Sequence, residues 1–159
     1  MSVDTVRTYL SQYDFADRIL EFDVSSATVE LAAEAVGCEP GMIAKSLTFL
    51  VDDKAVMIIA AGDMKIDNAK YKAFFHTKAK MLTPDQVVDM IGHAVGGVCP
   101  FAVKEGVSVY LDESLKRFET VYPAAGSSNN AVRLSIADLE QCSGYLQWID
   151  VCKLTDPQI

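Results

Sequence analysis

Apolar residues recur along this chain at helical spacing in some segments and at strand spacing in others. Val3, Val6 and Leu10 lie at helical spacing and predict a first helix over residues 2–13. A second helical pattern begins after Ser25 or Ser26 and ends at residue 36. Further helical patterns cover residues 68 to about 76, 83 to near 92 and 136–141, and a helical turn is predicted at 114–118. Strand patterns cover residues 18–22, 46–51, 55–61, 80–82, 107–111, 121–122, 131–134 and 145–151.

Capping residues mark where several of these helices begin and end. Ser25 or Ser26 is predicted to cap the second helix, and Gly37 to end it. Asp67 is predicted to cap the helix that follows it, and Ser135 the last helix. The serine and aspartate side chains at these positions are expected to bond to main-chain groups that the helix itself leaves without a partner.

The two most apolar strand patterns predict a hairpin. Residues 46–51 and 55–61 flank the polar sequence Asp52-Asp53-Lys54, which is typical of a turn between buried strands. Strands and helices are interspersed without a regular βαβ repeat, so we expect a mixed α/β fold, α+β-like, with a mixed, mostly antiparallel sheet flanked by helices. The 159 residues contain no linker or repeat and are 50% hydrophobic, which predicts a single compact domain over residues 1–159.

The overall charge restricts the partners that we expect. The chain has 14 basic and 22 acidic residues and a net charge of −8, so we expect no DNA partner, and an RNA partner would need a local basic face. No apolar run reaches the ~18–20 residues that a membrane-spanning helix needs, and no signal peptide begins the chain. We therefore expect a cytoplasmic protein with no membrane partner.

The cysteines and histidines predict no metal site. The four cysteines form no CxxC pair, and only two histidines are present, so we expect free thiols and no zinc. Cys99, beside Pro100, has two interpretations. It is either a nucleophile, which needs a histidine base close by, or a small buried apolar residue.

Two short segments are candidates for catalysis or binding. Lys45 precedes the apolar strand, where it is either a solvated strand end or an ammonium at the rim of a pocket, able to pair with a phosphate or polarise a carbonyl. Gly96 and Gly97 precede Pro100. Paired glycines either form an ordinary loop or let a ligand approach main-chain N–H groups closely.

A third candidate is a run of basic residues with Asp67 as its only acidic member. Lys72 and His76 lie four residues apart, on one face of the predicted helix. Such a run is either a solvated surface or the place where a polyanion docks. The lysines of this run are Lys65, Lys70, Lys72, Lys78 and Lys80.

The order of several short motifs resembles that of a known family. These motifs are Ile43-Ala44-Lys45-Ser46-Leu47, Ala60-Ala61-Gly62-Asp63, Ile66-Asp67, Gly92 with Gly96-Gly97-Val98-Cys99-Pro100-Phe101, Val121-Tyr122-Pro123-Ala124-Ala125-Gly126, and Leu134-Ser135-Ile136-Ala137-Asp138-Leu139. Together they are similar to the YbaK family, which comprises prolyl-tRNA synthetase-associated editing domains and their free-standing relatives. The resemblance extends from about Thr5 to Val151.

The resemblance implies hydrolysis of the ester that joins a wrong amino acid to tRNA, most often alanine or cysteine on proline tRNA. It implies Lys45 and Gly97 as catalytic residues, without a protein nucleophile, metal or organic cofactor. It also implies aminoacyl-tRNA, and an aminoacyl-tRNA synthetase, as partners. From the charge pattern we expect the five lysines of the basic run to face the tRNA. The expected substrate-binding residues are Phe22, Ser46, Gly96, Pro100, Gly126, Ser128 and Asn129.

Two positions depart from the cysteine-specific members of the family. Phe22 stands where they have a tyrosine, and Ala131 stands where they have an acid. The amino acid that is removed therefore stays open. Two other functions also stay open: a binding module that holds aminoacyl-tRNA or a nucleotide without hydrolysis, and a thiol hydrolase that uses Cys99.

Overall fold

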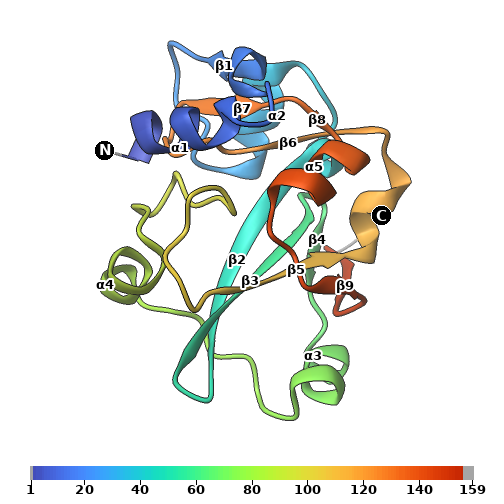
Figure 1. Ribbon diagram of the computed structural model, residues 1–159. Coiled ribbons are helices and arrows are strands. Elements are labelled where there is room, and N and C mark those ends of the chain that lie inside the picture. The colour runs from blue at the N-terminus through green and yellow to red at the C-terminus, as the bar shows by residue number, and fades with distance from the viewer. Residues whose placement is uncertain (1, 156–159) are drawn as a thin grey trace.

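The predicted hairpin forms the centre of the fold (Figure 1). The computed structural model describes residues 2–155, and its longest strands are β2 (Ile43–Val51) and β3 (Lys54–Ala61). They pair antiparallel, from Ala44 opposite Ala61 to Val51 opposite Lys54. Asp52 and Asp53 both have positive φ, at 51° and 65°, which matches the twist that a two-residue hairpin turn requires.

A six-stranded mixed sheet is built around this hairpin, in the order β8-β6-β2-β3-β5-β9. Its other strands are β5 (Ser108–Asp112), β6 (Thr120–Pro123), β8 (Leu134–Ser135) and β9 (Gln147–Ile149). Two small antiparallel sheets join β1 (Ile19–Glu21) to β7 (Asn130–Val132), and β4 (Met64–Ile66) to β10 (Cys152–Leu154). The expected mixed sheet is confirmed, although β2–β6, β3–β5 and β5–β9 in the large sheet are parallel.

Helices cover both faces of the hairpin. They are α1 (Ser2–Ser11), α2 (Val29–Val36), α3 (Asn68–Phe75), α4 (Pro84–Gln86), which continues as a π-helical turn over Val87–Ile91, and α5 (Ile136–Cys142). Ile59 of β3 packs in one core with α1 and α5, whereas its neighbour Ile58 packs in another with Tyr71 of α3. Burial on both faces explains why β3 is apolar without alternation.

Most of the predicted helix ends are confirmed. Asp67 accepts hydrogen bonds from the first turn of α3, Ser135 caps α5, and Gly37 ends α2 in the left-handed conformation. The predicted cap of α2 was wrong, because Thr28 accepts from Leu31 N. Ser26 is committed elsewhere, since its main chain and hydroxyl both donate to the Ser128 carbonyl.

Several short strands differ from the prediction. Residues 80–82 form only an isolated bridge, between Met81 and Phe49. The single strand expected at 131–134 is two strands, because the chain passes there from one sheet to another. The strand expected at 145–151 is shorter, since only β9 lies within it and β10 begins at Cys152. Strand β4 was not expected at all. Strands of two or three residues leave too little alternation for the pattern to separate them from loops.

Candidate functional site

Strand β2 is fully paired on one side and only partly paired on the other. β3 pairs with it from Ala44 to Val51. On its other side, β6 pairs only with the first two residues, Ile43 and Ala44. Farther along, the segment 80–82 makes two main-chain hydrogen bonds to β2, Leu82 N to Thr48 O at 3.1 Å and Leu50 N to Lys80 O at 2.8 Å. Residues 45–47 lie between these two pairings, and we call this stretch the β2 gap.

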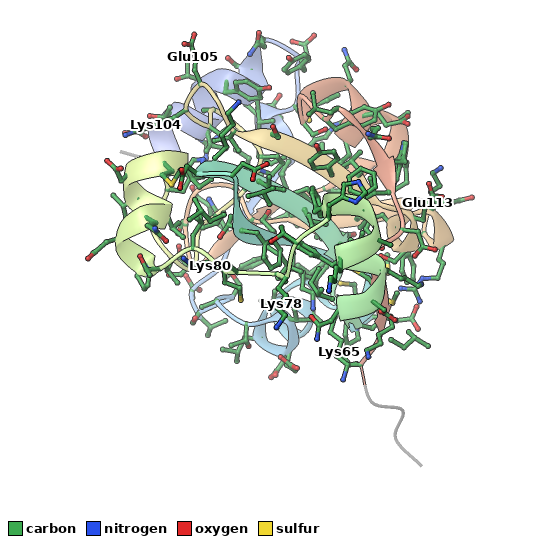
Figure 2. All side chains as sticks on the ribbon, turned by 90° about the horizontal axis from the view of Figure 1, so that it is seen from below. Lys65, Lys78, Lys80, Lys104, Glu105 and Glu113 are labelled. Atoms are coloured by element: carbon green, nitrogen blue, oxygen red, sulfur yellow. The ribbon has the colours of Figure 1, made fainter. Side chains whose placement is uncertain are left out.

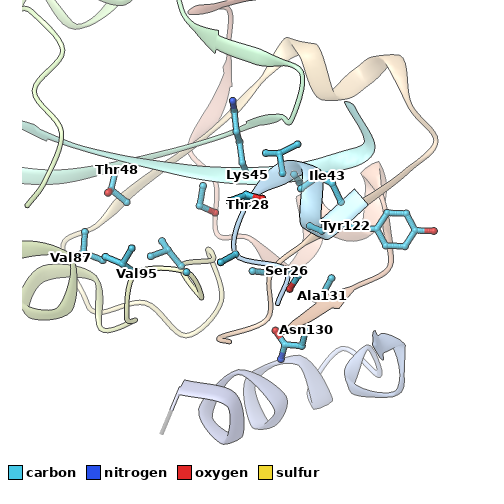
Figure 3. A pocket seen from close by; sticks show the side chains of 18 of the residues that line it. Ser26, Thr28, Ile43, Lys45, Thr48, Val87, Val95, Tyr122, Asn130 and Ala131 are labelled. Carbon is cyan, nitrogen blue, oxygen red and sulfur yellow. The ribbon is translucent and has the colours of Figure 1, made fainter. Parts of the chain in front are cut away.

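A cavity of about 340 Å³ lies at the β2 gap (Figure 3). Its walls come from α2 and the segment before it, β2, the segment 81–87, the loop 95–98 and the strands β6 and β7. Most of these side chains are small or aliphatic, so the cavity suits a small, largely apolar group. Examples are Val29, Ala32, Val87, Val98, Ala124 and Ala131.

Among the residues that the structure describes, Lys45 is the one lysine or arginine in the wall of this cavity. The residue is half-buried, and its ammonium donates a hydrogen bond to the Met64 carbonyl of β4. In Figure 3 its side chain extends from β2 away from Val87 and Val95, as the alternation of a strand requires. Burial lowers the pKa of Lys45 below its ordinary value, although nearby Cys152, Asp63 and Glu30 favour the charged form. Lys45 is therefore a pocket residue and not a solvated strand end.

An ion pair holds one of the carboxylates near Lys45. Arg117 donates to both oxygens of Asp63, at 3.0 and 2.5 Å. This bidentate contact is the main reason why the pKa of Asp63 lies below its usual value. Asp63 is thus committed to Arg117. The sequence did not reveal this pair, because 54 residues separate its members.

Gly96 forms one side of the cavity, and Ser128 lies behind it, outside the cavity wall. Gly96 lines it with φ at 98°, and a Cβ on this glycine would lie 3.3 Å from the Ser128 Cβ. The Ser128 carbonyl accepts from Ser26 N at 2.6 Å, which joins the loop after β6 to the segment before α2. Asn130, which sequence reasoning missed, bonds with both side-chain amide atoms to the Ala125 main chain at 3.1 Å. A polar residue directly after a turn cluster is the signal that points to such a side-chain clamp.

Gly97 does not line the cavity. Its N–H donates to the Ala94 carbonyl at 3.0 Å, so it is not free to bind a substrate oxygen. A Cβ on Gly97 would lie 2.6 Å from the main chain of Gly126 and Ser127. The paired glycines therefore have different functions, since Gly96 faces the cavity and Gly97 allows two loops to pack closely. Pro100 is buried and also lies outside the cavity wall.

Two further candidates lie at a second, more polar hollow. Phe22 and Asn129 line this space of about 280 Å³ together with Asp23 and Ser127. The Asn129 amide donates to the Phe22 carbonyl at 3.3 Å. The geometry therefore separates Phe22 and Asn129 from Lys45, and the replacement of tyrosine by Phe22 does not alter the cavity wall.

Cys99 has a histidine beside it, but the pair does not suit nucleophilic catalysis. Its Sγ lies 3.6 Å from His93 Nε2, which in turn lies 2.7 Å from the Phe101 carbonyl. Burial raises the pKa of the Cys99 thiol to about 12 and lowers that of His93. Neither side chain lines the cavity. These contacts favour the interpretation of Cys99 as a packing residue.

The predicted basic run is divided by the fold. Lys65, Lys78 and Lys80 lie on one side of the molecule (Figure 2), and Lys80 directly precedes Met81 at the cavity wall. Lys70, in contrast, forms an ion pair with Asp150 at 3.0 Å and donates to the Cys152 carbonyl.

His76 also departs from the predicted helical face. It ends α3 in the left-handed conformation, so the face that was expected to join it to Lys72 does not form. Lys72 itself is exposed.

Two further properties bear on the expected partners. In residues 2–155 no group of three or more His, Cys, Asp or Glu side chains is arranged to hold a metal ion. None of the helices described for this chain combines the length and apolar character that crossing a membrane requires.

Comparison with known proteins identifies the class of protein to which this cavity belongs. Residues 24–142, which include every residue of the cavity wall, match the aminoacyl-tRNA editing domain, and the chain belongs to this family. The resemblance expected from the sequence motifs is confirmed.

Individual relatives agree with this assignment. The chain is 49% identical over 154 residues to the uncharacterized protein YwhH of Bacillus subtilis (strain 168), covering 96% of this chain and 98% of YwhH. It is 30% identical over 90 residues to proline–tRNA ligase of Geobacillus sp. (strain WCH70), where 56% of this chain but only 16% of the ligase aligns.

Solved structures show the same fold. A crystal structure assigned provisionally as a trans-editing enzyme for prolyl tRNA synthetase aligns with a TM-score of 0.86 at 29% identity, covering 96% of this chain and 97% of the other. The hypothetical protein APE2540 aligns with a TM-score of 0.76 at 25% identity, covering 86% and 91%.

The contact between Gly97 and the Gly126–Ser127 main chain predicts the effect of adding one methyl group. Gly97→Ala is expected to lower the melting temperature by roughly 2–10 °C, because main-chain atoms cannot move aside as side chains do. Thermal unfolding of both proteins measures this loss. Gly106→Ala serves as a comparison for main-chain strain without a clash, since φ there is 90° and a Cβ meets no atom within 4 Å, and Gly97→Ala should lose more. An unchanged melting temperature for Gly97→Ala would contradict the packing function.

Proposed function

We propose that this protein is a trans-editing deacylase, which hydrolyses the ester between a small, wrongly attached amino acid and tRNA. The observation that carries the proposal is the small apolar cavity at the β2 gap, with a half-buried lysine in its wall. An aminoacyl ester is already activated, so the protein needs to orient water and stabilise negative charge more than to supply a nucleophile.

The cavity walls support alanine as the amino acid that is removed, with cysteine as the next candidate. Ala131 places a methyl group where an acid would make the wall polar, and Val29, Val87 and Val98 make other parts apolar. A pocket gains only ~1–3 kcal/mol per methylene, so selection against larger residues has to rest on steric exclusion. Proline, the correct amino acid of a proline tRNA, has two more side-chain carbons than alanine, and discrimination against it would rest on the same exclusion.

Lys45 is the residue to which we assign the central catalytic function. Its ammonium is held at the cavity by the Met64 carbonyl, a contact that a substrate phosphate or ester carbonyl can replace. Its partial burial strengthens any interaction with a negative oxygen. Ser46 and Gly96 complete the proposed substrate-binding wall, and Ser128 lies behind Gly96. Gly97, Gly126 and Pro100 support this wall from behind.

The proposed tRNA-binding surface begins beside the cavity. Lys80 adjoins Met81 of the cavity wall, and Lys65, Lys72 and Lys78 continue the basic surface from β4 and the α3 region. Lys70 contributes less, because Asp150 already neutralises it. A prolyl-tRNA synthetase is the proposed second partner, in the cytoplasm, because the related segment in proline–tRNA ligases is part of that enzyme.

The rival function is a binding module that holds aminoacyl-tRNA without hydrolysing it. The fold and the cavity are compatible with both functions. A panel of mischarged tRNAs separates them, because only a deacylase releases free amino acid.

Lys45→Ala is expected to reduce single-turnover deacylation of alanyl-tRNA by at least ~10²-fold, the scale on which one charge-stabilising group acts. The loss should occur without unfolding, because Lys45 makes a polar contact at the cavity rather than a core contact. Rate and thermal unfolding are measured on the same preparation. A wild-type rate in the variant would refute the assignment, and a lost melting transition would make Lys45 a structural residue.

Cys99→Ser tests the thiol hydrolase directly. We expect the variant to keep at least a tenth of the wild-type rate, a difference of about 1.4 kcal/mol in barrier, because the buried thiol does not reach the cavity. Single-turnover kinetics with the same alanyl-tRNA provide the measurement. A loss of several orders of magnitude in a folded variant would restore Cys99 as the nucleophile.

The basic surface predicts a salt-dependent effect. Changing Lys72 and Lys78 together to Glu should weaken tRNA binding and lower the slope of log affinity against log salt by roughly 0.7–0.9 per lysine. Lys104→Glu is the control, because Lys104 lies away from Lys65 and Lys78 in Figure 2. Binding is measured at several salt concentrations, and hydrolysis of a minimal aminoacyl-nucleotide should change little. Equal slopes in the double variant and the wild type would show that this surface is only solvated.

A further inference from the structure

The β2 gap leaves the main chain of one residue without a strand partner. Main-chain groups in a strand point alternately to its two sides. Thr48 O and Leu50 N point toward the segment 80–82, away from β3. Ser46 lies two residues before Thr48 and four before Leu50. Its N–H and C=O therefore point to the side of β2 that faces away from β3, as theirs do. There β6 has already ended and the segment 80–82 has not yet begun.

The side chain of Ser46 is also without a partner. Its Oγ is buried and makes no hydrogen bond within the described residues. Ser46 lines the cavity next to Lys45. An unpaired main-chain donor and a buried, unpartnered hydroxyl at one residue are costly unless a ligand or water satisfies them.

The main-chain N–H of Gly97, which the sequence also suggested as a donor to the substrate, already has a hydrogen-bond partner. The N–H of Gly97 donates to the Ala94 carbonyl, and Gly97 lies behind the cavity wall. The N–H of Gly97 is therefore not the donor for the reacting oxygen, and the edge of β2 at Ser46 offers another.

We infer that the main-chain N–H of Ser46 binds the carbonyl oxygen of the aminoacyl ester and stabilises the oxyanion during hydrolysis. This inference rests on the proposed deacylase function. A water oxygen bonds to the ester carbon, and the carbonyl electron pair moves to the oxygen that faces Ser46 N–H. The carbon–oxygen bond to the ribose then breaks, and the ribose oxygen receives the proton that the water gives up. The products are the free amino acid and tRNA with a free hydroxyl.

Proline at this position removes the main-chain donor together with the serine hydroxyl, and Ser46→Ala measures the contribution of the hydroxyl by itself. Proline is tolerated in strands where its nitrogen faces away from the paired neighbour. Lys45, which would precede it, already has the extended conformation that this position demands. Ser46→Pro should therefore fold and lose deacylation, whereas Leu47→Pro, whose nitrogen faces β3, should fail to fold.

The experiment compares three replacements of Ser46 with alanyl-tRNA as the substrate. Ser46→Ala removes the hydroxyl alone, and we expect at most about a tenfold loss of kcat, as for one hydrogen bond. Ser46→Pro removes the N–H in addition to the hydroxyl, and we expect a loss of ~10²–10³-fold in kcat with little change in tRNA affinity. The third variant carries the α-hydroxy analogue of serine, so that an ester oxygen replaces the N–H while the side chain is kept. It should lose as much as the proline variant, and it provides the test if Ser46→Pro does not fold.

The outcomes separate this inference from the proposed function. If the wild type releases no amino acid from any mischarged tRNA, the deacylase proposal itself fails. If the wild type is active and the folded ester variant keeps more than a tenth of its kcat, the assignment of Ser46 is overturned while the deacylase stands. A loss of 10²-fold or more at unchanged tRNA affinity and melting temperature supports it.

Discussion

The interruption of main-chain pairing along β2 is the feature on which the site depends. A central strand with both edges paired would offer no main-chain group to a ligand and no space for one. Here β6 leaves after Ala44 and the segment 80–82 begins pairing at Thr48, so the gap and the cavity have the same cause. A buried, unpaired peptide group costs about 1–3 kcal/mol, and a site where a ligand supplies the missing partner recovers this cost on binding.

Contacts around the cavity keep this gap from closing. On one side, Gly97 packs against the Gly126–Ser127 main chain, and Asn130 holds Ala125 through both atoms of its amide. On the other side, Lys45 is held by the Met64 carbonyl. These contacts involve main-chain atoms, which have fewer alternative positions than side chains do. The wall of the cavity is therefore fixed before a substrate arrives, and preorganisation of this kind favours stabilisation of a transition state.

Sequence patterns predicted the parts of the fold that are long and locally determined. The hairpin, the cap at Asp67, the cap at Ser135 and the position of Lys45 before an apolar strand all follow from neighbouring residues. The remaining features depend on residues far apart in the chain. The Lys70–Asp150 ion pair spans 80 residues, and no local pattern shows that a predicted RNA-binding lysine is already neutralised.

The glycine pair shows the same limit at the scale of single residues. Both glycines allow close approach of another group, but only the fold determines whether the glycine faces a cavity, as Gly96 does, or a second loop, as Gly97 does. Likewise, the histidine beside Cys99 was invisible to spacing, and once found it proved too buried to activate the thiol.

Selection by size follows from the small residues at the cavity wall. Where Gly96, Ala27, Ala32 and Ala124 form the wall, the boundary of the cavity lies close to the main chain. A boundary of long side chains would yield to a larger amino acid by changing rotamers, whereas a boundary set by hydrogen-bonded main chain resists displacement. Weak attraction for a small side chain is then sufficient, because discrimination comes from what the cavity cannot admit. The small residues that make the wall stiff also leave few polar groups along that part of it. In the proposed function, Lys45 and the free edge of β2 would therefore contact the ester and not the amino-acid side chain.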